Sequence, residues 1–193
     1  MRRKLTTLCF LVGCWLNGVA AAIEPDTAPV DPRLKQLLQQ AIKAPNHFED
    51  KFAAQVWLQD MNQRLRRFVD DPDERVEILK SVHFEASRAD LEPELVLAVI
   101  DVESKFDRFA ISVAGARGLM QIMPFWIDEI GLSDNNLFKI RTNLRMGCTI
   151  LRYYLDMENG DLGPALARYN GSYGRTWYPE LVATALHKRW FKQ

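Results

Sequence analysis

The feature that most constrains this chain is an apolar segment that ends in an acidic residue. Residues 95–102 read Leu-Val-Leu-Ala-Val-Ile-Asp-Val, so Asp101 is the one polar side chain among them, and Glu103 follows directly. A helix of this composition must be covered by protein on nearly every side. The segment therefore predicts a central, buried helix that carries a carboxylate at its end.

Glu103 is the strongest candidate for a chemically active side chain. Val96, Val99 and Ile100 lie seven, four and three residues before it and so share its helical face. An apolar wall and the negative end of the helix dipole both raise a carboxyl pKa, which is what a general acid needs. The ordinary alternative is a solvated glutamate in a last helical turn, since Glu is rarely buried.

A glycine-punctuated loop follows Glu103. Residues 114–118 read Ala-Gly-Ala-Arg-Gly, and the two glycines permit tight turns and close approach of a ligand to the backbone. Pro124 is placed to start a new helix at its first turn, and Gly131 to end it.

Three motifs in this order resemble the soluble-type lytic transglycosylases, relatives of the goose-type lysozymes that cleave peptidoglycan. They are Glu103-Ser104 after the apolar helix, residues 112–124 (Ser-Val-Ala-Gly-Ala-Arg-Gly-Leu-Met-Gln-Ile-Met-Pro) and residues 165–171 (Ala-Leu-Ala-Arg-Tyr-Asn-Gly). The resemblance covers about residues 72–178. Arg108 stands where the family often has Pro, and Arg168 where a small residue is common.

The resemblance implies an all-α, lysozyme-like catalytic domain, here with additional N-terminal helices; no alternating strand pattern contradicts it. It also implies the reaction. Glycosidases usually need two carboxylates, whereas these enzymes let the C6 hydroxyl of the sugar attack its own anomeric carbon. Glu103 would act first as acid and then as base, and cleavage of the MurNAc-GlcNAc bond would give a 1,6-anhydromuramyl product.

The remaining site residues follow from the same motifs. Ser112, Gln121 and Met123 are expected near the cleaved bond, Tyr169 to hydrogen-bond or position the acid, and Asn170 to fix the turn that presents Tyr169. Core packing is the alternative for Met123.

Two other functions compete with this interpretation. A goose-type hydrolase would need a second carboxylate to hold water, for which Asp107 and Asp101 are the candidates. A non-catalytic glycan-binding module would have no need of the acid at position 103. Tyr173, Trp177 and Tyr178 could floor sugar subsites, although such clusters are as often packing.

The first residues read as an export signal. Arg2, Arg3 and Lys4 precede an apolar run, and Ala20-Ala21-Ala22 offers a cleavage site, which predicts a signal peptide over 1–22 and a periplasmic protein. The alternative is a membrane-tethered lipoprotein, because residues 11–14 (Leu-Val-Gly-Cys) resemble a lipobox that would be cut before Cys14.

Beyond the signal we expect a linker and N-terminal helix over 23–47 and the catalytic domain over 48–193. Helical spacing and capping residues predict helices at about 31–43, 48–69, 72–86, 140–157, 162–169 and 179–191. Nothing after the signal is long and apolar enough to span a membrane.

Composition excludes several partner classes. Lys plus Arg and Asp plus Glu both number 25, so no net field attracts nucleic acid. The three histidines, at 47, 83 and 187, lack metal-ligand spacing, and no cofactor is expected. Cys148 would be the one cysteine left after signal removal and is assigned to the core. The expected partner is the peptidoglycan glycan strand, bound by a monomer.

Overall fold

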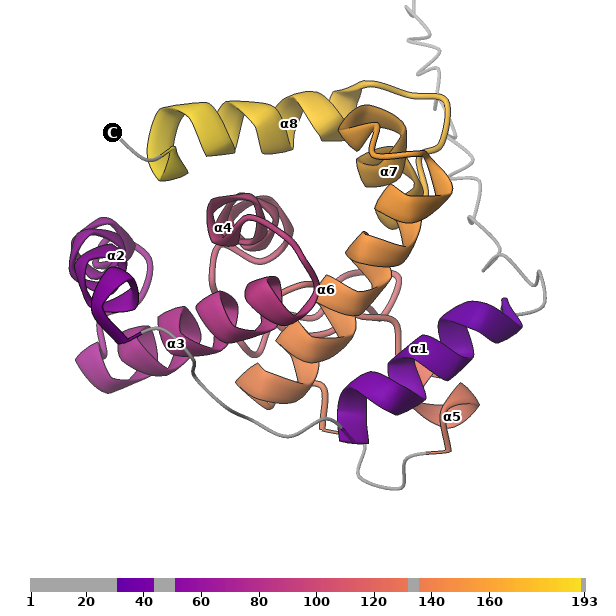
Figure 1. Ribbon diagram of the computed structural model, residues 1–193, viewed down its shortest axis with the longest axis horizontal. Coiled ribbons are helices and arrows are strands. Elements are labelled where there is room, and N and C mark those ends of the chain that lie inside the picture. Colours follow the sequence, from indigo (N-terminus) through magenta and orange to yellow (C-terminus); the bar gives the residue numbers. More distant parts are fainter. Residues whose placement is uncertain (1–30, 44–50, 132–135, 192–193) are drawn as a thin grey trace, which may run out of the picture.

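A computed structural model of the protein describes residues 31–43, 51–131 and 136–191 (Figure 1). Every regular element in these ranges is helical, and the pairing of β type there is limited to two isolated bridges that Arg117 makes with Ile111 and with Ile122. The predicted all-α class is confirmed. The predicted boundaries at 22/23 and 47/48 lie outside the described residues.

The elements, in chain order, are α1 (Pro32–Lys43), α2 (Lys51–Leu65), α3 (Pro72–Arg88), α4 (Pro93–Glu103), α5 (Phe125–Glu129), α6 (Ile140–Met157), α7 (Leu162–Tyr169), α8 (Trp177–Ala185) and a π-helical turn η1 (Leu186–Trp190). None of the helices in the described ranges has the length and apolar character needed to cross a membrane.

Helix α4 is the centre of the fold. Residues 95–101 are all buried, and α3, α8 and η1 pack against the helix. In Figure 1 it is seen end-on, with α8 above it and α3 below. Because each buried Leu, Val or Ile side chain contributes about 1.5–3 kcal/mol, the apolar composition of this segment explains its central position.

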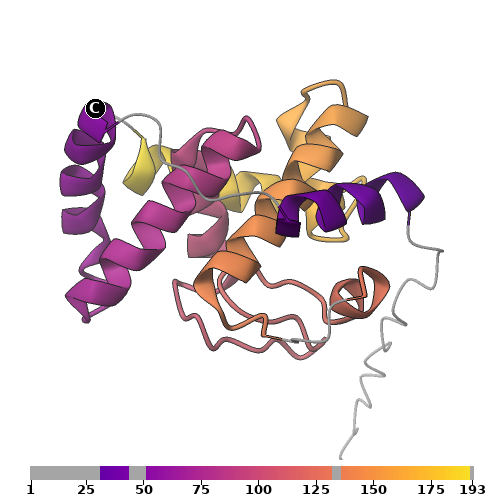
Figure 2. The same cartoon turned by 60° about the horizontal axis from the view of Figure 1, so that its bottom comes forward.

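Helix α6 is the second central helix of the fold. It follows α5 in the sequence, and its buried length packs against α1, α3 and α7. Helix α1 lies across it (Figure 2), with Leu34, Leu38 and Ala41 buried at helical spacing. Asp31 caps α1 through the backbone N–H of Arg33 and accepts a hydrogen bond from the Tyr153 hydroxyl on α6.

The final helix differs from its prediction. It begins at Trp177 rather than at Pro179, and it ends in the π-helical turn η1. Pro179 thus lies in the first turn, where backbone N–H groups have no intrahelical partner and a proline is tolerated. The turn is tied to α2, because Arg64 donates to the carbonyl oxygens of Arg189 and Phe191, both at 3.0 Å.

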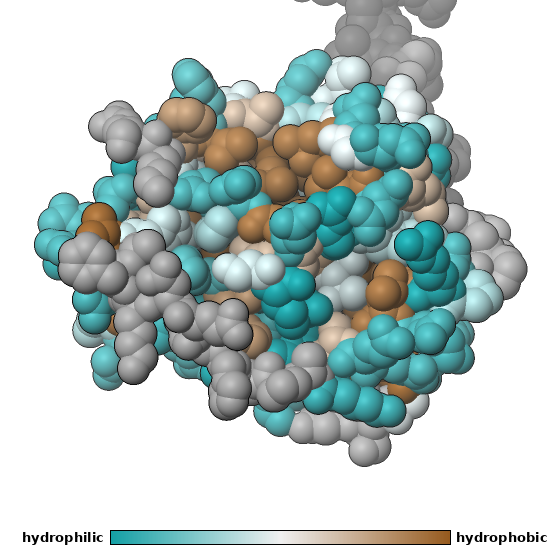
Figure 3. All heavy atoms as spheres, viewed as in Figure 1, coloured by the Kyte–Doolittle hydropathy of each residue, from teal (hydrophilic) through white to brown (hydrophobic). Residues whose placement is uncertain are grey.

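The face of the molecule shown in Figure 3 is mostly hydrophilic, with apolar side chains gathered below α8. The segment between α4 and α5, residues 104–124, is instead seen in Figure 2, where it runs beneath α3 and α6. It carries three of the six residues of the predicted site, Ser112, Gln121 and Met123.

Candidate active site

Glu103 is the last residue of α4, and the backbone after it turns away sharply. Ser104 is the C-cap, and its hydroxyl donates to the carbonyl oxygen of Leu119 at 2.8 Å. Lys105 and Phe106 both have positive φ, 53° and 67°, a conformation that costs about 1–2 kcal/mol per residue. Burial of the Phe106 ring to 2% exposure offsets this cost. The turn places Glu103 at the C-terminal end of α4, where the chain leads away from the helix.

Among the residues that the structure describes, one side chain hydrogen-bonds the carboxyl group of Glu103. The Tyr178 hydroxyl, from α8, donates to Glu103 Oε1 at 2.5 Å. Burial raises the pKa of Glu103 from 4.5 to about 7, and the hydrogen bond from Tyr178 lowers it in part. Burial, and then the nearby Glu103 charge, raise the pKa of Tyr178 well above its ordinary value, so the hydroxyl stays neutral and remains a donor.

Tyr169 is close to the acid but serves another group. Its hydroxyl donates to the carbonyl oxygen of Met120 at 2.8 Å. Burial raises the pKa of Tyr169, and the charge of Glu103 raises it further, which places the two side chains within electrostatic range. Of the two roles expected for Tyr169, the hydrogen bond to the acid is made by Tyr178 instead, and the positioning of the acid stays a prediction.

The loop residues predicted for the site hold the loop in shape. Gln121, at a positive φ of 49°, donates its side-chain amide to the carbonyl oxygens of Gly118 at 2.9 Å and Ala110 at 3.3 Å. The Ser112 hydroxyl accepts the backbone N–H of Ala116 at 3.0 Å and is otherwise exposed.

Two more predicted residues lie at the edges of these segments. Met123 is half-buried, just before α5. Asn170 is the C-cap of α7 with a right-handed backbone, and the left-handed residue that turns the chain is Gly171, with a φ of 74°. The structure thus brings Tyr169 near Glu103 and leaves the substrate contacts of the other residues as predictions.

Sequence reasoning missed the residue that fixes this loop to α6. Asn143 donates to the carbonyl oxygens of Arg117 at 2.8 Å and Leu137 at 2.9 Å, and its oxygen accepts the Met120 N–H at 2.7 Å. Its side-chain amide thus forms three bonds with the loops around it, at 1% exposure. Its position in the buried stripe of an amphipathic helix is the signal that could have identified it.

Neither candidate for a second carboxylate is placed to hold water at the acid. Asp101 is fully buried and accepts from Lys105 at 3.0 Å, from Trp190 at 2.9 Å and from Arg189. Burial alone would raise the pKa of Asp101, but these hydrogen bonds outweigh it and lower the pKa. Asp107 is exposed and caps its own loop through the N–H of Phe109 at 2.8 Å.

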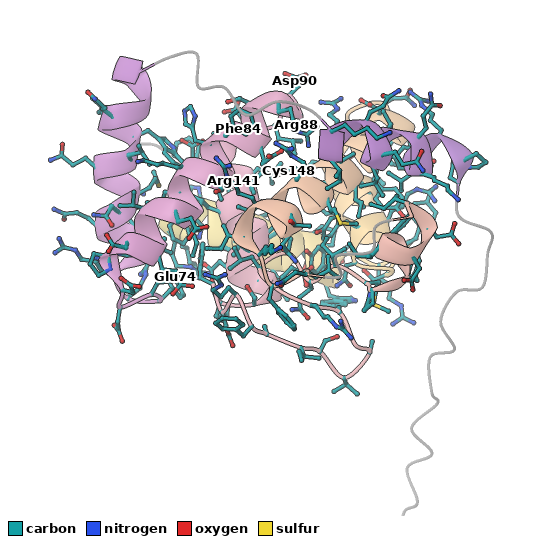
Figure 4. The ribbon with its side chains drawn as sticks, turned by 90° about the horizontal axis from the view of Figure 1, so that it is seen from below. Glu74, Phe84, Arg88, Asp90, Arg141 and Cys148 are labelled. Carbon is teal, nitrogen blue, oxygen red and sulfur yellow. The ribbon has the colours of Figure 1, made fainter. Side chains whose placement is uncertain are left out.

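A surface pocket of about 410 Å³ lies between α1, the end of α3 and α6, and it is separate from this site. Thr149, in its lining, is two residues from Gly147, whose Cα packs against Met120. Residues two apart point to opposite sides of a helix. Figure 4 shows Arg88 and Asp90 of the pocket on the side away from the 104–124 loop.

Within the described ranges no cluster of His, Cys, Asp and Glu could hold a metal ion.

The sequence model of a protein family described as the Transglycosylase SLT domain matches residues 80–188, more than half of the chain. The chain belongs to this family. The match begins within α3 and includes Glu103, the loop that follows it and both tyrosines at the site. The predicted kinship with the lytic transglycosylases is thereby confirmed.

Several curated proteins are similar to parts of the chain. A transglycosylase of Enterobacteria phage PRD1 is 35% identical over 45% of this chain and 31% of its own length. A membrane-bound lytic murein transglycosylase F of Desulfosudis oleivorans is 36% identical over 51% of this chain and 22% of its own. The chain thus spans a third or less of the length of these relatives. The X-ray structure of lytic transglycosylase Slt from Pseudomonas aeruginosa is 20% identical, with a TM-score of 0.45 over 82% of this chain and 34% of that one.

Proposed function

We propose that this SLT-family chain is a peptidoglycan lytic transglycosylase, which cleaves the β-1,4 bond between MurNAc and GlcNAc without water. The observation that carries the proposal is the carboxyl group of Glu103, whose pKa is about 7 and whose Oε1 is occupied by the Tyr178 hydroxyl. Such a group is protonated in a large fraction of molecules near neutral pH and can both give and take a proton.

The proposed reaction has two steps. First, the protonated Glu103 gives its proton to the glycosidic oxygen, the bond from that oxygen to the anomeric carbon of MurNAc breaks, and the GlcNAc-ended fragment leaves. Second, the Glu103 carboxylate takes the proton of the MurNAc C6 hydroxyl while O6 bonds to the anomeric carbon. Glu103 ends protonated, as it began, and no water is consumed.

The Tyr178 hydroxyl has a defined part in both steps. Because it donates to Oε1, it leaves Oε2 for the substrate, and it stabilises the carboxylate that exists between the steps. An internal C6 hydroxyl has a high effective concentration compared with water. Asp101 and Asp107 accept hydrogen bonds from other groups, Trp190 and the Phe109 N–H, rather than facing the acid. This favours the internal route over a goose-type hydrolase.

The loop residues receive supporting roles in this proposal. Ser112 and Met123 would line the substrate groove, and Gln121 would keep the loop that carries them in shape. Tyr169 would position the loop through Met120, and Asn170 would fix the turn that follows Tyr169. The bound partner is the glycan strand of peptidoglycan.

The test is digestion of purified murein sacculi with mass analysis of the products. The wild type should release muropeptides that are lighter by one water than lysozyme products and lack a reducing end. Glu103→Gln, which is isosteric, should lower turnover by at least about 100-fold. Glu77→Gln, on the exposed face of α3, is the matched control and should keep full activity.

Two outcomes would contradict the proposal. Reducing products, together with a loss in Asp107→Asn as large as in Glu103→Gln, would indicate a hydrolase. Binding to sacculi with no release of product by the wild type would indicate a non-catalytic glycan-binding module.

We also propose that the chain acts in the periplasm as a monomer after removal of residues 1–22. These residues lie outside the described ranges, and the support is their basic head, apolar run and alanines. N-terminal sequencing should find Ile23 in the soluble periplasmic fraction. A blocked Cys14 in the membrane fraction would establish the lipoprotein instead.

A further inference from the structure

The loop between α7 and α8, residues 170–176, connects the two tyrosines beside the acid. Tyr169 precedes it and Tyr178 follows it closely, so Tyr173 lies four residues from one and five from the other. Even a fully extended chain would place its Cα at most about 14 Å and 18 Å from theirs. Tyr173 is therefore within a few sugar rings of the Glu103 carboxyl.

Backbone hydrogen bonds give this loop a fixed shape. The N–H of Ser172 donates to the carbonyl oxygen of Ala167 at 2.7 Å, and the N–H of Arg175 donates to that of Ser172 at 2.9 Å. Gly171 and Gly174 supply left-handed turns, with φ of 74° and 81°. A side chain on this loop is therefore presented at a defined position.

One face of the Tyr173 ring packs on the guanidinium group of Arg168. The guanidinium carbon of Arg168 lies 3.8 Å from the centre of the Tyr173 ring, and the Nε of Arg168 donates to Glu158 at the end of α6. The ion pair fixes the guanidinium, and the guanidinium fixes one face of the ring by a cation–π contact. The Tyr173 side chain nevertheless stays 58% exposed. An aromatic ring is thus held rigid with its second face in solvent.

We propose that Tyr173 is a sugar-binding platform on which an N-acetylhexosamine ring of the glycan strand packs, a few units from the bond that is cleaved. This inference rests on the proposed function and names one of its subsites. A pyranose ring has an apolar C–H face that matches the open face of an aromatic ring, and its hydroxyl groups remain in water at the rim. Arg168 is the positioning residue, since it acts through the ring. Pre-ordering the ring reduces the entropy lost on binding.

The experiment measures the affinity of the inactive Glu103→Gln protein for a β-1,4-linked GlcNAc hexamer by calorimetry. In that background Tyr173→Ala should weaken binding by about threefold to tenfold, and Tyr173→Phe should keep most of the affinity because the ring remains. Phe191→Ala is the matched control: Phe191 has the same exposure, 58%, but lies at the other end of the final helix. It should bind like the parent.

The role of Arg168 is tested by a double-mutant cycle. Arg168→Ala should weaken binding of the hexamer, but it should add little to Tyr173→Ala, because the guanidinium acts through the ring. Strictly additive losses would show that Arg168 does not act through Tyr173. Unchanged affinity of Tyr173→Ala, with anhydro products still formed by the wild type, would overturn the platform alone. Failure of Glu103→Gln itself to bind the hexamer or sacculi would overturn the platform and the proposed substrate together.

Discussion

Replacing Glu103 by glutamine should make the protein more stable, by an amount that grows as the pH rises from 4.5 to about 7. The substitution removes a group that resists ionisation in the folded state, because burial raises its pKa to about 7 from 4.5. Glutamine keeps the shape, and its oxygen can still accept the hydrogen bond from Tyr178. What disappears is the cost of holding a negative charge in that place.

The size and sign of the effect follow from the two pKa values. Between pH 4.5 and about 7 the unfolded chain loses the Glu103 proton while the folded protein keeps it, so the wild-type free energy of unfolding falls as pH rises. The pKa values differ by about 2.5, and one pKa unit corresponds to about 1.4 kcal/mol. Above pH 7 the glutamine variant should therefore be the more stable by up to about 3 kcal/mol. Below pH 4.5 the two proteins should be alike.

The assay is denaturant unfolding of both proteins at about pH 4 and about pH 8, compared as differences so that all other titrating groups cancel. In thermal melts the gain at the higher pH corresponds to as much as about 10 °C. Glu77→Gln, on the surface of α3, should stay within about 0.5 kcal/mol of the wild type at both pH values. If the difference in free energy of unfolding between Glu103→Gln and wild type does not change with pH, burial does not raise the pKa of Glu103.

Three further changes probe the surroundings of the acid. Tyr178→Phe removes a hydrogen bond that lowers the pKa of Glu103, so the alkaline limb of the pH–rate profile for sacculus digestion should move to higher pH as activity falls; an unmoved limb would contradict the contact. Gly118→Ala should destabilise the protein by at least about 2 kcal/mol in urea unfolding, because a Cβ at this position, with φ +76°, would lie 2.4 Å from the Asn143 side-chain nitrogen. Asp101→Asn should cost about 3 kcal/mol at neutral pH, and since the pKa of Asp101 is lowered, the loss should shrink as pH falls below 3.8; a constant loss in pH-dependent melts would contradict the lowered pKa.

The helices that carry the site could be predicted from sequence because their signals are local. The limits of α6 and α7 agree with the prediction at both ends, since apolar periodicity and the Asn-Gly turn mark them. The final helix was misplaced by two residues, because a proline that is tolerated anywhere in a first turn does not fix where the helix begins.

The partner of the acid could not be predicted in the same way. Tyr178 lies 75 residues from Glu103. Its neighbours Trp177 and Pro179 indicate only that a helix begins there. Whether its hydroxyl faces solvent, a sugar or a carboxylate depends on how α8 packs on α4, which no local pattern encodes. For the same reason the motif pointed to Tyr169, whereas the hydrogen bond to the acid comes from Tyr178.

The distance along the chain between Glu103 and Tyr178 also determines when the proposed enzyme becomes competent. A chain that has emerged from a ribosome or an export channel only as far as the 104–124 loop already contains the acid, but it lacks the α8 hydroxyl that orients it. The carboxyl then remains hydrated and close to its ordinary acidity. The proposed activity therefore requires α8 to be packed on α4, because the Tyr178 hydroxyl reaches the acid from that helix.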